Sequence, residues 1–211
     1  MLTRRSFLSI TTAATAVAAL GRVPQRHPLA IIALGPLGAR VQRRLQERGY
    51  AARYWVWDFA PPDAADLGAA FPVVIPRRKW GERSGISDAL AATLGDGRFT
   101  RVLLVAGLGD EVAALLAGPV ARVLDERRTV VAVAALTPAR ERDGWWGILR
   151  ARRALRELDA TSASVVVGSG TGAWREARRY TDVEAGYRVE CEVRLLGAAD
   201  ETARWLVADL A

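Results

Sequence analysis

The 211-residue sequence is poor in the residue types that many metal sites and nucleophilic active sites require. It contains one cysteine and one histidine, Cys191 and His27. A single cysteine forms no intramolecular disulfide, and a single histidine supplies neither a two-histidine zinc site nor a Ser-His-Asp triad. We therefore expect no metal ion and no catalytic residues.

Long apolar runs are also missing, apart from a short one near the N-terminus. Residues Ile10–Leu20 are apolar or small, but these eleven residues are too few to span a bilayer as a helix. Their length is typical of a secretory signal peptide, and Ala16 and Ala18 form an Ala-x-Ala cleavage site. The preceding residues resemble the twin-arginine export pattern Ser/Thr-Arg-Arg-x-Phe-Leu through Arg4, Arg5, Phe7 and Leu8.

This N-terminal pattern predicts how the chain is divided and where it acts. We expect residues 1–26 to be a twin-arginine (Tat) signal peptide with a linker, and residues 27–211 to form a single domain. The Tat translocase is then a partner during export, and the mature protein is periplasmic. In the alternative interpretation the two arginines belong to a solvated N-terminus, and the protein is cytoplasmic.

The charge is unequal, with 30 basic against 23 acidic residues and a net charge of +7. The arginines are scattered, and Arg77–Lys79 is the only run of three basic residues. Aromatic residues do not interleave with the basic ones as they do on many nucleic-acid-binding surfaces, so we expect no nucleic-acid partner. A general basic surface favours association with a membrane surface.

From Leu29 onward, apolar runs alternate with amphipathic helical segments, which predicts a three-layer, Rossmann-like α/β sandwich with a mostly parallel sheet. The predicted strands are 29–34, 52–57, 71–75, 101–106, 129–136 and 164–168. The predicted helices are 39–48, 84–94, 110–126, 148–158 and 198–210.

Residues 187–196 have a different pattern, because apolar and polar side chains alternate strictly. The alternating set is Tyr187, Val189, Cys191, Val193 and Leu195. Such alternation is typical of a half-exposed strand, so we predict an antiparallel edge strand near the C-terminus, with Cys191 facing the core.

The segment from Leu29 to Val167 resembles the nucleotide-binding domain of the tubulin/FtsZ family. The order of its motifs carries the resemblance: a first strand and Gly-containing turn, a glycine turn after a later strand, a Pro-Val helix and a strand ending in Thr-x-Pro type residues. These motifs occupy Gly35–Gly38, Ala106–Gly109, Gly118–Ala121 and Ala135–Pro138. The resemblance implies the tubulin/FtsZ GTPase-domain topology.

The resemblance also implies where GTP or GDP would bind. The implied nucleotide-binding residues are Gly35, Gly38, Gly107, Gly109 and Asp58. Several of the family's glycines are replaced here. Pro36 removes a backbone donor from the first loop, and Asp110 and Glu111 stand at the helix N-terminus where a phosphate would lie. Acids that cap a helix repel a phosphate at short range. We therefore expect a degenerate site without a cofactor. We also expect the family's acidic activation loop and second domain to be missing.

Three other features have competing interpretations. Residues Gly168–Ala173 fit the dinucleotide pattern Gly-x-Gly-x-x-Ala, in which an anion would contact Gly168, Ser169, Gly170 and Thr171; a plain strand-to-helix turn is the simpler interpretation. Asp58 is either a ribose ligand or a turn former. Trp145 and Trp146 either form an exposed partner patch or, as we expect, pack over the sheet edge.

The sequence thus favours an exported, degenerate FtsZ/tubulin-like domain that is not an enzyme and acts by binding an unidentified protein partner. Its oligomeric state is left open. The first alternative is a cytoplasmic FtsZ-like GTP-binding protein or GTPase. The second is a dinucleotide-dependent enzyme that uses the Gly168–Ala173 loop.

Overall fold

The computed structural model describes residues 29–76, 83–95 and 99–208. The proposed signal residues Arg4, Arg5, Phe7 and Leu8 lie outside these ranges. Six parallel strands form one sheet in the order β3-β2-β1-β4-β5-β6. The strands are β1 (Leu29–Leu34), β2 (Arg53–Asp58), β3 (Phe71–Val74), β4 (Arg101–Gly107), β5 (Val130–Thr137) and β6 (Ser164–Ser169).

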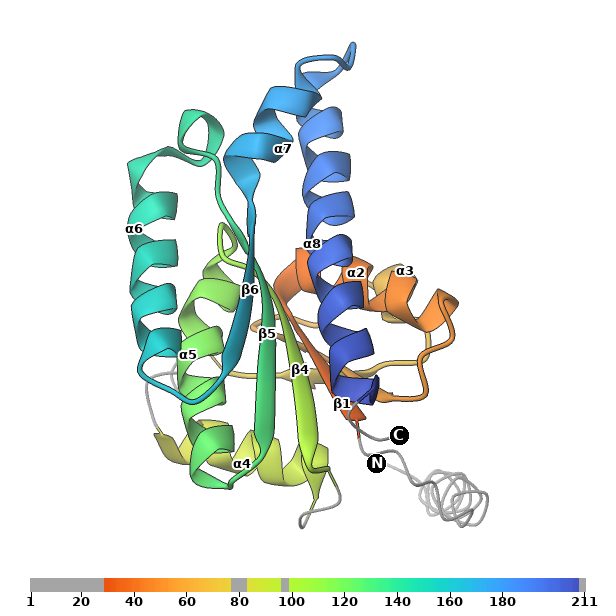
Figure 1. Ribbon diagram of the computed structural model, residues 1–211, viewed down its shortest axis with the longest axis vertical. Coiled ribbons are helices and arrows are strands. Elements are labelled where there is room, and N and C mark those ends of the chain that lie inside the picture. Colours follow the sequence, from red (N-terminus) through yellow and green to blue (C-terminus); the bar gives the residue numbers. More distant parts are fainter. Residues whose placement is uncertain (1–28, 77–82, 96–98, 209–211) are drawn as a thin grey trace, which may run out of the picture.

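Helices cover both faces of the sheet (Figure 1). One face packs against α4, α5 and α6, and the other against α2, α7 and α8, while α3 contacts α2. The helices are α2 (Gly35–Glu47), α3 (Ala64–Leu67), α4 (Arg83–Leu94), α5 (Glu111–Glu126), α6 (Arg140–Asp159), α7 (Gly170–Ala177) and α8 (Val183–Ala208). This confirms the predicted three-layer α/β sandwich.

The central strands are buried on both faces, which explains their unbroken apolar sequences. Every residue of β1 is fully buried, and successive side chains belong to opposite faces. Ala30, Ile32 and Leu34 join the core under α4–α6, whereas Leu29 and Ile31 join the core under α2 and α8. A parallel sheet covered on both sides requires apolar residues at every position.

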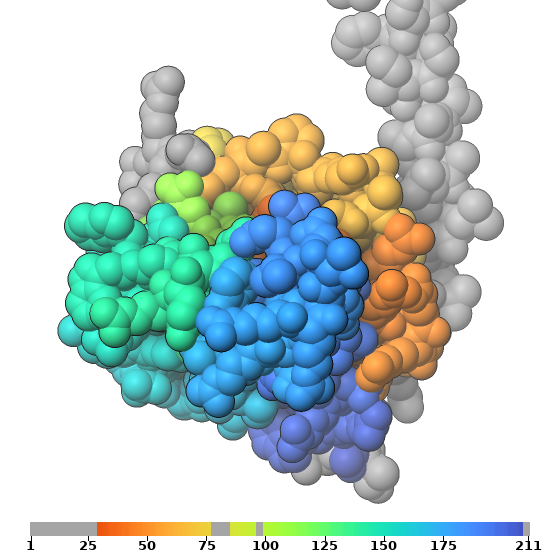
Figure 2. Space-filling model, turned by 90° about the horizontal axis from the view of Figure 1, so that it is seen from above, coloured from red at the N-terminus to blue at the C-terminus, as the bar shows by residue number. Residues whose placement is uncertain are grey.

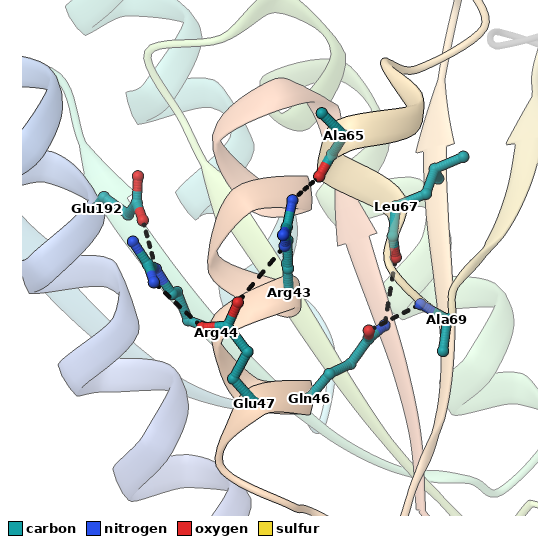
Figure 3. A network of polar contacts seen from close by, with 8 residues as sticks. All are labelled: Arg43, Arg44, Gln46, Glu47, Ala65, Leu67, Ala69 and Glu192. Carbon is teal, nitrogen blue, oxygen red and sulfur yellow. Dashed lines mark hydrogen bonds and ion pairs between the residues drawn. The ribbon is translucent and has the colours of Figure 1, made fainter.

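The outer surface of α2 is tied to its neighbours by polar contacts (Figure 3). Toward α3, the Gln46 side chain accepts a hydrogen bond from the Ala69 amide at 2.9 Å, and Arg43 donates to the carbonyl of Ala65. Toward α8, Arg44 donates to Glu192 at 3.3 Å. These contacts fix the C-terminal half of α2, whose first turn lies at the opposite end of the helix.

The predicted antiparallel edge strand over 187–196 is wrong, because these residues lie within the 26-residue helix α8. Tyr187, Cys191 and Leu195 are spaced four residues apart and are buried against the sheet. Val189 and Val193 occupy the opposite side and are 48% and 57% exposed. The alternation therefore arises from two helical stripes, since positions i and i+4 share a helix face.

The expectation that the tryptophan pair packs over the sheet edge is also wrong. Trp145 is 52% exposed and Trp146 is 75% exposed. The preceding residue, Gly144, has φ 68° and ψ −175°, which interrupts the helical geometry inside α6. The pair follows this kink directly and projects from the first regular turn after it. Within the described ranges, no helix is long and apolar enough to cross a membrane.

Candidate functional site

A cavity of about 380 Å³ lies at the carboxyl edge of the sheet, where ligands of open α/β folds bind. Figure 2 looks onto this end of the molecule, with the α6 region (teal) beside the α7–α8 region (blue). The wall of the cavity is formed by the β1–α2, β4–α5 and β5–α6 turns and by α8. The lining includes Leu37, Arg40, Gly107, Gly109, Asp110, Pro138, Arg142, Asp143, Tyr187, Arg188 and Cys191.

The carboxylate of Asp110 occupies the space beside the first turn. Gly35 has φ +71°, and a Cβ added there would lie 2.8 Å from Oδ1 of Asp110. The same oxygen accepts a hydrogen bond from the Val112 amide at 2.7 Å and caps α5. The predicted helix cap is therefore present, and it stands between the first and second turns.

The pKa of Asp110 is raised, first because the carboxyl group is buried and further by the nearby charges of Asp58 and Glu111. Hydrogen bonds from the amides of Val112 and Ala113 act in the opposite direction. A further anion placed here would meet the same burial and the same repulsion.

Leu37 covers the second glycine turn. A Cβ added to Gly107 would lie 2.7 Å from Cδ2 of Leu37. The amides of this turn are also used within the chain: Leu108 donates to the carbonyl of Leu136 at 2.8 Å, and Asp110 donates to the carbonyl of Gly107 at 2.8 Å. A phosphate needs inward-pointing N–H groups, so these two amides are unavailable to it.

The opposite wall is a network around Asp143. The Tyr187 hydroxyl donates to Oδ2 of Asp143 at 2.8 Å, and the Ala139 amide donates to the same oxygen at 2.8 Å. Arg142 bonds to Oδ1 at 2.6 Å and also reaches Glu184 at 3.1 Å. Burial and the bond to Asp143 raise the pKa of Tyr187, so its hydroxyl stays protonated at neutral pH. The network orders the cavity wall and engages both carboxylate oxygens of Asp143.

Cys191 lies between this network and the core. It is buried, and burial raises the pKa of its thiol to about 11. The protonated thiol is a poor nucleophile at neutral pH. Its predicted place in the core is confirmed, although it reaches the core from a helix instead of a strand.

The cavity retains basic side chains. Arg40 pairs with Glu192 at 3.4 Å, and Arg142 is held by Asp143 and Glu184. Arg188 lines the cavity and forms no ion pair with any residue that the structure describes. The cavity wall therefore presents one uncommitted guanidinium group.

The sequence-predicted nucleotide residues are only partly brought together. Gly107 and Gly109 line the cavity, whereas Gly35 and Gly38 are buried beneath it. A Cβ on Gly38 would lie 2.8 Å from the Val105 carbonyl, so this glycine allows α2 to approach β4 closely. Asp58 does not line the cavity; its carboxylate accepts from the amide of Phe59 at 2.6 Å as a turn former.

The Gly168–Ala173 loop stands at the same sheet edge but is packed against the chain itself. A Cβ on Gly170 would lie 2.9 Å from the Ala139 amide nitrogen, and one on Gly168 would lie 3.0 Å from Leu136 Cδ1. Ser169 caps α7 by accepting from the Gly172 amide at 3.4 Å. Neither these residues nor Thr171 lines the cavity.

Sequence reasoning missed the α8 and β5–α6 side of the cavity. Tyr187 and Arg188 were assigned to a strand, which placed them away from the carboxyl edge. A helical interpretation of the four-residue spacing between Tyr187 and Cys191 would have put both at one end of a sheet-covering helix. In the described parts of the chain, no group of three or more His, Cys, Asp or Glu side chains is arranged to hold a metal ion.

The solved structures that are similar to this chain include FtsZ, CetZ2 and TubZ proteins. FtsZ from M. jannaschii, solved as an empty dimer, aligns with a TM-score of 0.69 at 14% identity, over 96% of this chain and 59% of that chain. CetZ2 from Haloferax volcanii, solved as a GTPγS-bound protofilament, gives 0.61 at 20% identity, over 83% and 58%. TubZ of Clostridium botulinum phage c-st gives 0.55 at 10% identity, over 78% and 57%.

These similarities show the fold alone, which is the Rossmann-like α/β fold of the FtsZ and tubulin GTPase domains. The chain spans 57–59% of the length of these three structures. No protein-family model matches the sequence, and no curated protein matches it.

Proposed function

We propose that this chain is an exported, non-catalytic FtsZ/tubulin-like domain whose nucleotide site is closed and which acts by binding a protein partner. One observation carries the proposal: Asp110 and Leu37 fill the space beside the two glycine turns where a phosphate would have to lie. The fold itself supplies the expectation of a nucleotide, and these two side chains argue against it.

The electrostatic cost of placing a phosphate beside Asp110 supports the same conclusion. Two unit charges 4 Å apart interact by about 1 kcal/mol in bulk water and by about 4 kcal/mol near a protein surface. A phosphate beside the ionised Asp110 carboxylate carries this repulsion for each of its charges. It also finds the amides of Leu108 and Asp110 already bonded. Binding would require both side chains to leave their positions.

Isothermal titration with GTP, GDP and NAD tests the closed site. We expect no binding in the micromolar range to the wild-type protein. Leu37→Gly combined with Asp110→Ser is the matched variant, because serine retains a helix cap while the bulk and the charge are removed. We expect any gain in affinity to appear in this variant. Micromolar binding of any of the three ligands to the wild type would overturn the proposal.

The export part of the proposal depends on the Arg4-Arg5 pattern. N-terminal sequencing of the mature protein, with Arg4→Lys and Arg5→Lys as the comparison, tests it. A new N-terminus near Ala18 to Arg26 in a periplasmic fraction supports export. An intact N-terminus in the cytoplasm, unaffected by the lysine changes, contradicts it.

A second candidate function is that of a cytoplasmic GTP- or GDP-binding protein. Two observations favour it: a similar solved structure holds GTPγS, and the cavity wall retains the uncommitted Arg188. The titration above separates the two candidates. A dinucleotide-dependent enzyme has less support, because the Gly168–Ala173 loop is packed against the β5–α6 turn.

Self-association is one form of the proposed binding function, since the similar solved structures include a dimer and protofilaments. Sedimentation velocity of the purified chain over a concentration series distinguishes a second copy from a different protein as the partner. A concentration-dependent rise in sedimentation coefficient favours the second copy.

A further inference from the structure

The outer side of α6 combines exposed tryptophans with arginines. After the Gly144 kink, the buried side of the helix is formed by Gly147, Ala151, Ala154 and Leu158. The helix stands at the outside of the molecule, against α5 (Figure 1). We define the α6 face as the exposed residues Trp145, Trp146, Arg150, Arg152, Arg153 and Arg156.

Three of these side chains lie along one side of the helix. Trp145, Arg152 and Arg156 follow one another at spacings of seven and four residues, which places them on one stripe. The guanidinium carbon of Arg152 lies 5.6 Å from the Trp145 ring centroid, and that of Arg140 lies 5.8 Å from it. Such contacts hold the indole in place, while Trp146 stands free with 75% of its surface exposed.

The positive charge of the α6 face is largely uncompensated. Arg153 pairs with Glu157 at 3.0 Å. Within the described residues, no ion pair involves Arg150, Arg152 or Arg156. The whole chain adds to this charge, since its net charge is +7. A partner that binds this face is therefore negatively charged and contacts the two tryptophans at one end of it.

We propose that the α6 face docks the protein onto an anionic phospholipid bilayer, with the indoles of Trp145 and Trp146 at headgroup level and the arginines on lipid phosphates. Tryptophan is enriched at membrane interfaces because its ring is apolar and its N–H is polar. Arginines near an anionic surface are attracted by about 1 kcal/mol each, which is about a fivefold gain in partitioning.

The shape of the face favours a bilayer over a macromolecular partner. An acidic protein would bury Trp146 in a pocket of its own, and nucleic acid would need aromatic residues interleaved with the basic ones. Here both tryptophans lie at one end of a convex helix and the arginines occupy the following turns. A fluid anionic plane needs no complementary pocket.

Co-sedimentation of the full chain with vesicles tests this proposal. We expect binding to phosphatidylcholine vesicles containing phosphatidylglycerol and none to phosphatidylcholine alone. Arg152→Gln with Arg156→Gln should weaken binding by about 25-fold, the product of two fivefold losses. The matched control, Arg53→Gln with Arg178→Gln, removes the same charge from exposed positions elsewhere and should stay within about twofold, since screened attraction falls off over a Debye length.

Fluorescence quenching by brominated phosphatidylglycerol tests the orientation. We expect quenching of the wild type and loss of most of it in Trp145→Phe with Trp146→Phe, while Trp205→Phe, which removes an exposed tryptophan of α8, retains it. Three outcomes would each overturn the proposal. The first is an equal loss of vesicle binding in the two double-arginine variants, and the second is quenching that the tryptophan substitutions of α6 leave unchanged. The third is binding to nucleic acid or to an acidic protein without binding to vesicles. These outcomes are independent of the nucleotide titration, because the inference goes beyond the proposed function and concerns a different surface.

Discussion

At the scale of single residues, Gly35 and Asp110 form the contact on which the closed site depends. Gly35 adopts φ +71°, a conformation that L side chains rarely adopt, and it does so directly beside the Asp110 carboxylate. Gly49 adopts a similar φ of +78°, but a Cβ there would meet nothing within 4 Å. A comparison of substitutions at the two glycines therefore separates the cost of backbone strain from the cost of a steric contact.

We predict that Gly35→Ala destabilises the protein more than Gly49→Ala. The backbone penalty of a left-handed alanine is about 1–2 kcal/mol and applies to both variants. At Gly35 the new Cβ also displaces the Asp110 cap, which costs about 1 kcal/mol more. Urea unfolding followed by circular dichroism measures the difference. Equal free energies of unfolding for the two variants would contradict the close contact.

Cys191 gives a second prediction at this scale, concerning alkaline pH. Burial raises the pKa of its thiol from 9.0 to about 11 in the folded protein. Between these values the unfolded chain loses the proton and the folded chain keeps it. The free energy of unfolding therefore falls as pH rises from about 9 to about 11.

Cys191→Ala should make this decline less steep. The comparison is made by urea unfolding of both proteins across the same pH range. Tyrosines with raised pKa values, such as Tyr54 with a pKa of about 12, contribute a similar decline at higher pH in both proteins. An identical dependence of the free energy of unfolding on pH in the two proteins would show that burial does not raise the pKa of the thiol.

At the scale of elements, the six strands of the sheet were predictable, and so was the C-terminal part of α8, but the N-terminal part of α8 was not. Apolar runs such as Ile31–Leu34 and Leu103–Ala106 are buried on both faces, so composition alone identified them. The predicted cap at Asp110 follows from local sequence and is present. The alternation from Tyr187 to Leu195 fits both a strand and two stripes of a helix, and only packing against the sheet decides between them.

A pair of substitutions in α8 tests this assignment. In the predicted strand, Val193 and Leu195 would share a buried face and be equally sensitive. In the observed helix, Leu195 is fully buried and Val193 is exposed. We predict a loss of about 2–5 kcal/mol for Leu195→Ala and a change within about 0.5 kcal/mol for Val193→Ala. Similar losses in thermal or urea unfolding would refute the helical register.

At the scale of the whole molecule, the sheet order brings together segments that are far apart in the sequence. The β1–α2 and β4–α5 turns meet in the middle of the carboxyl edge because β1 and β4 are neighbours. Contacts such as that between Tyr187 and Asp143 join positions 44 residues apart. No local pattern encodes them, which explains why the glycine turns could be predicted and the rest of the cavity wall could not.

The salt bridges of α6 and α2 lie mostly at the surface, where an exposed pair contributes about 0–1 kcal/mol. The stability of the molecule therefore rests on the two apolar layers that sandwich the sheet. The exposed arginines are then free for recognition, and changing them on α6 should alter binding to vesicles without altering the fold.

The Asp110 carboxylate has one more consequence. Nucleotides bind by mass action, so occupancy of an ordinary phosphate site rises and falls with ligand concentration. The Asp110 carboxyl group at the start of α5 is a covalent part of the chain, so every copy carries it in this position. On our proposal, the domain has no loaded and unloaded forms and no hydrolysis to time the passage between them. Its associations would then respond only to concentration, salt and the surfaces available to it.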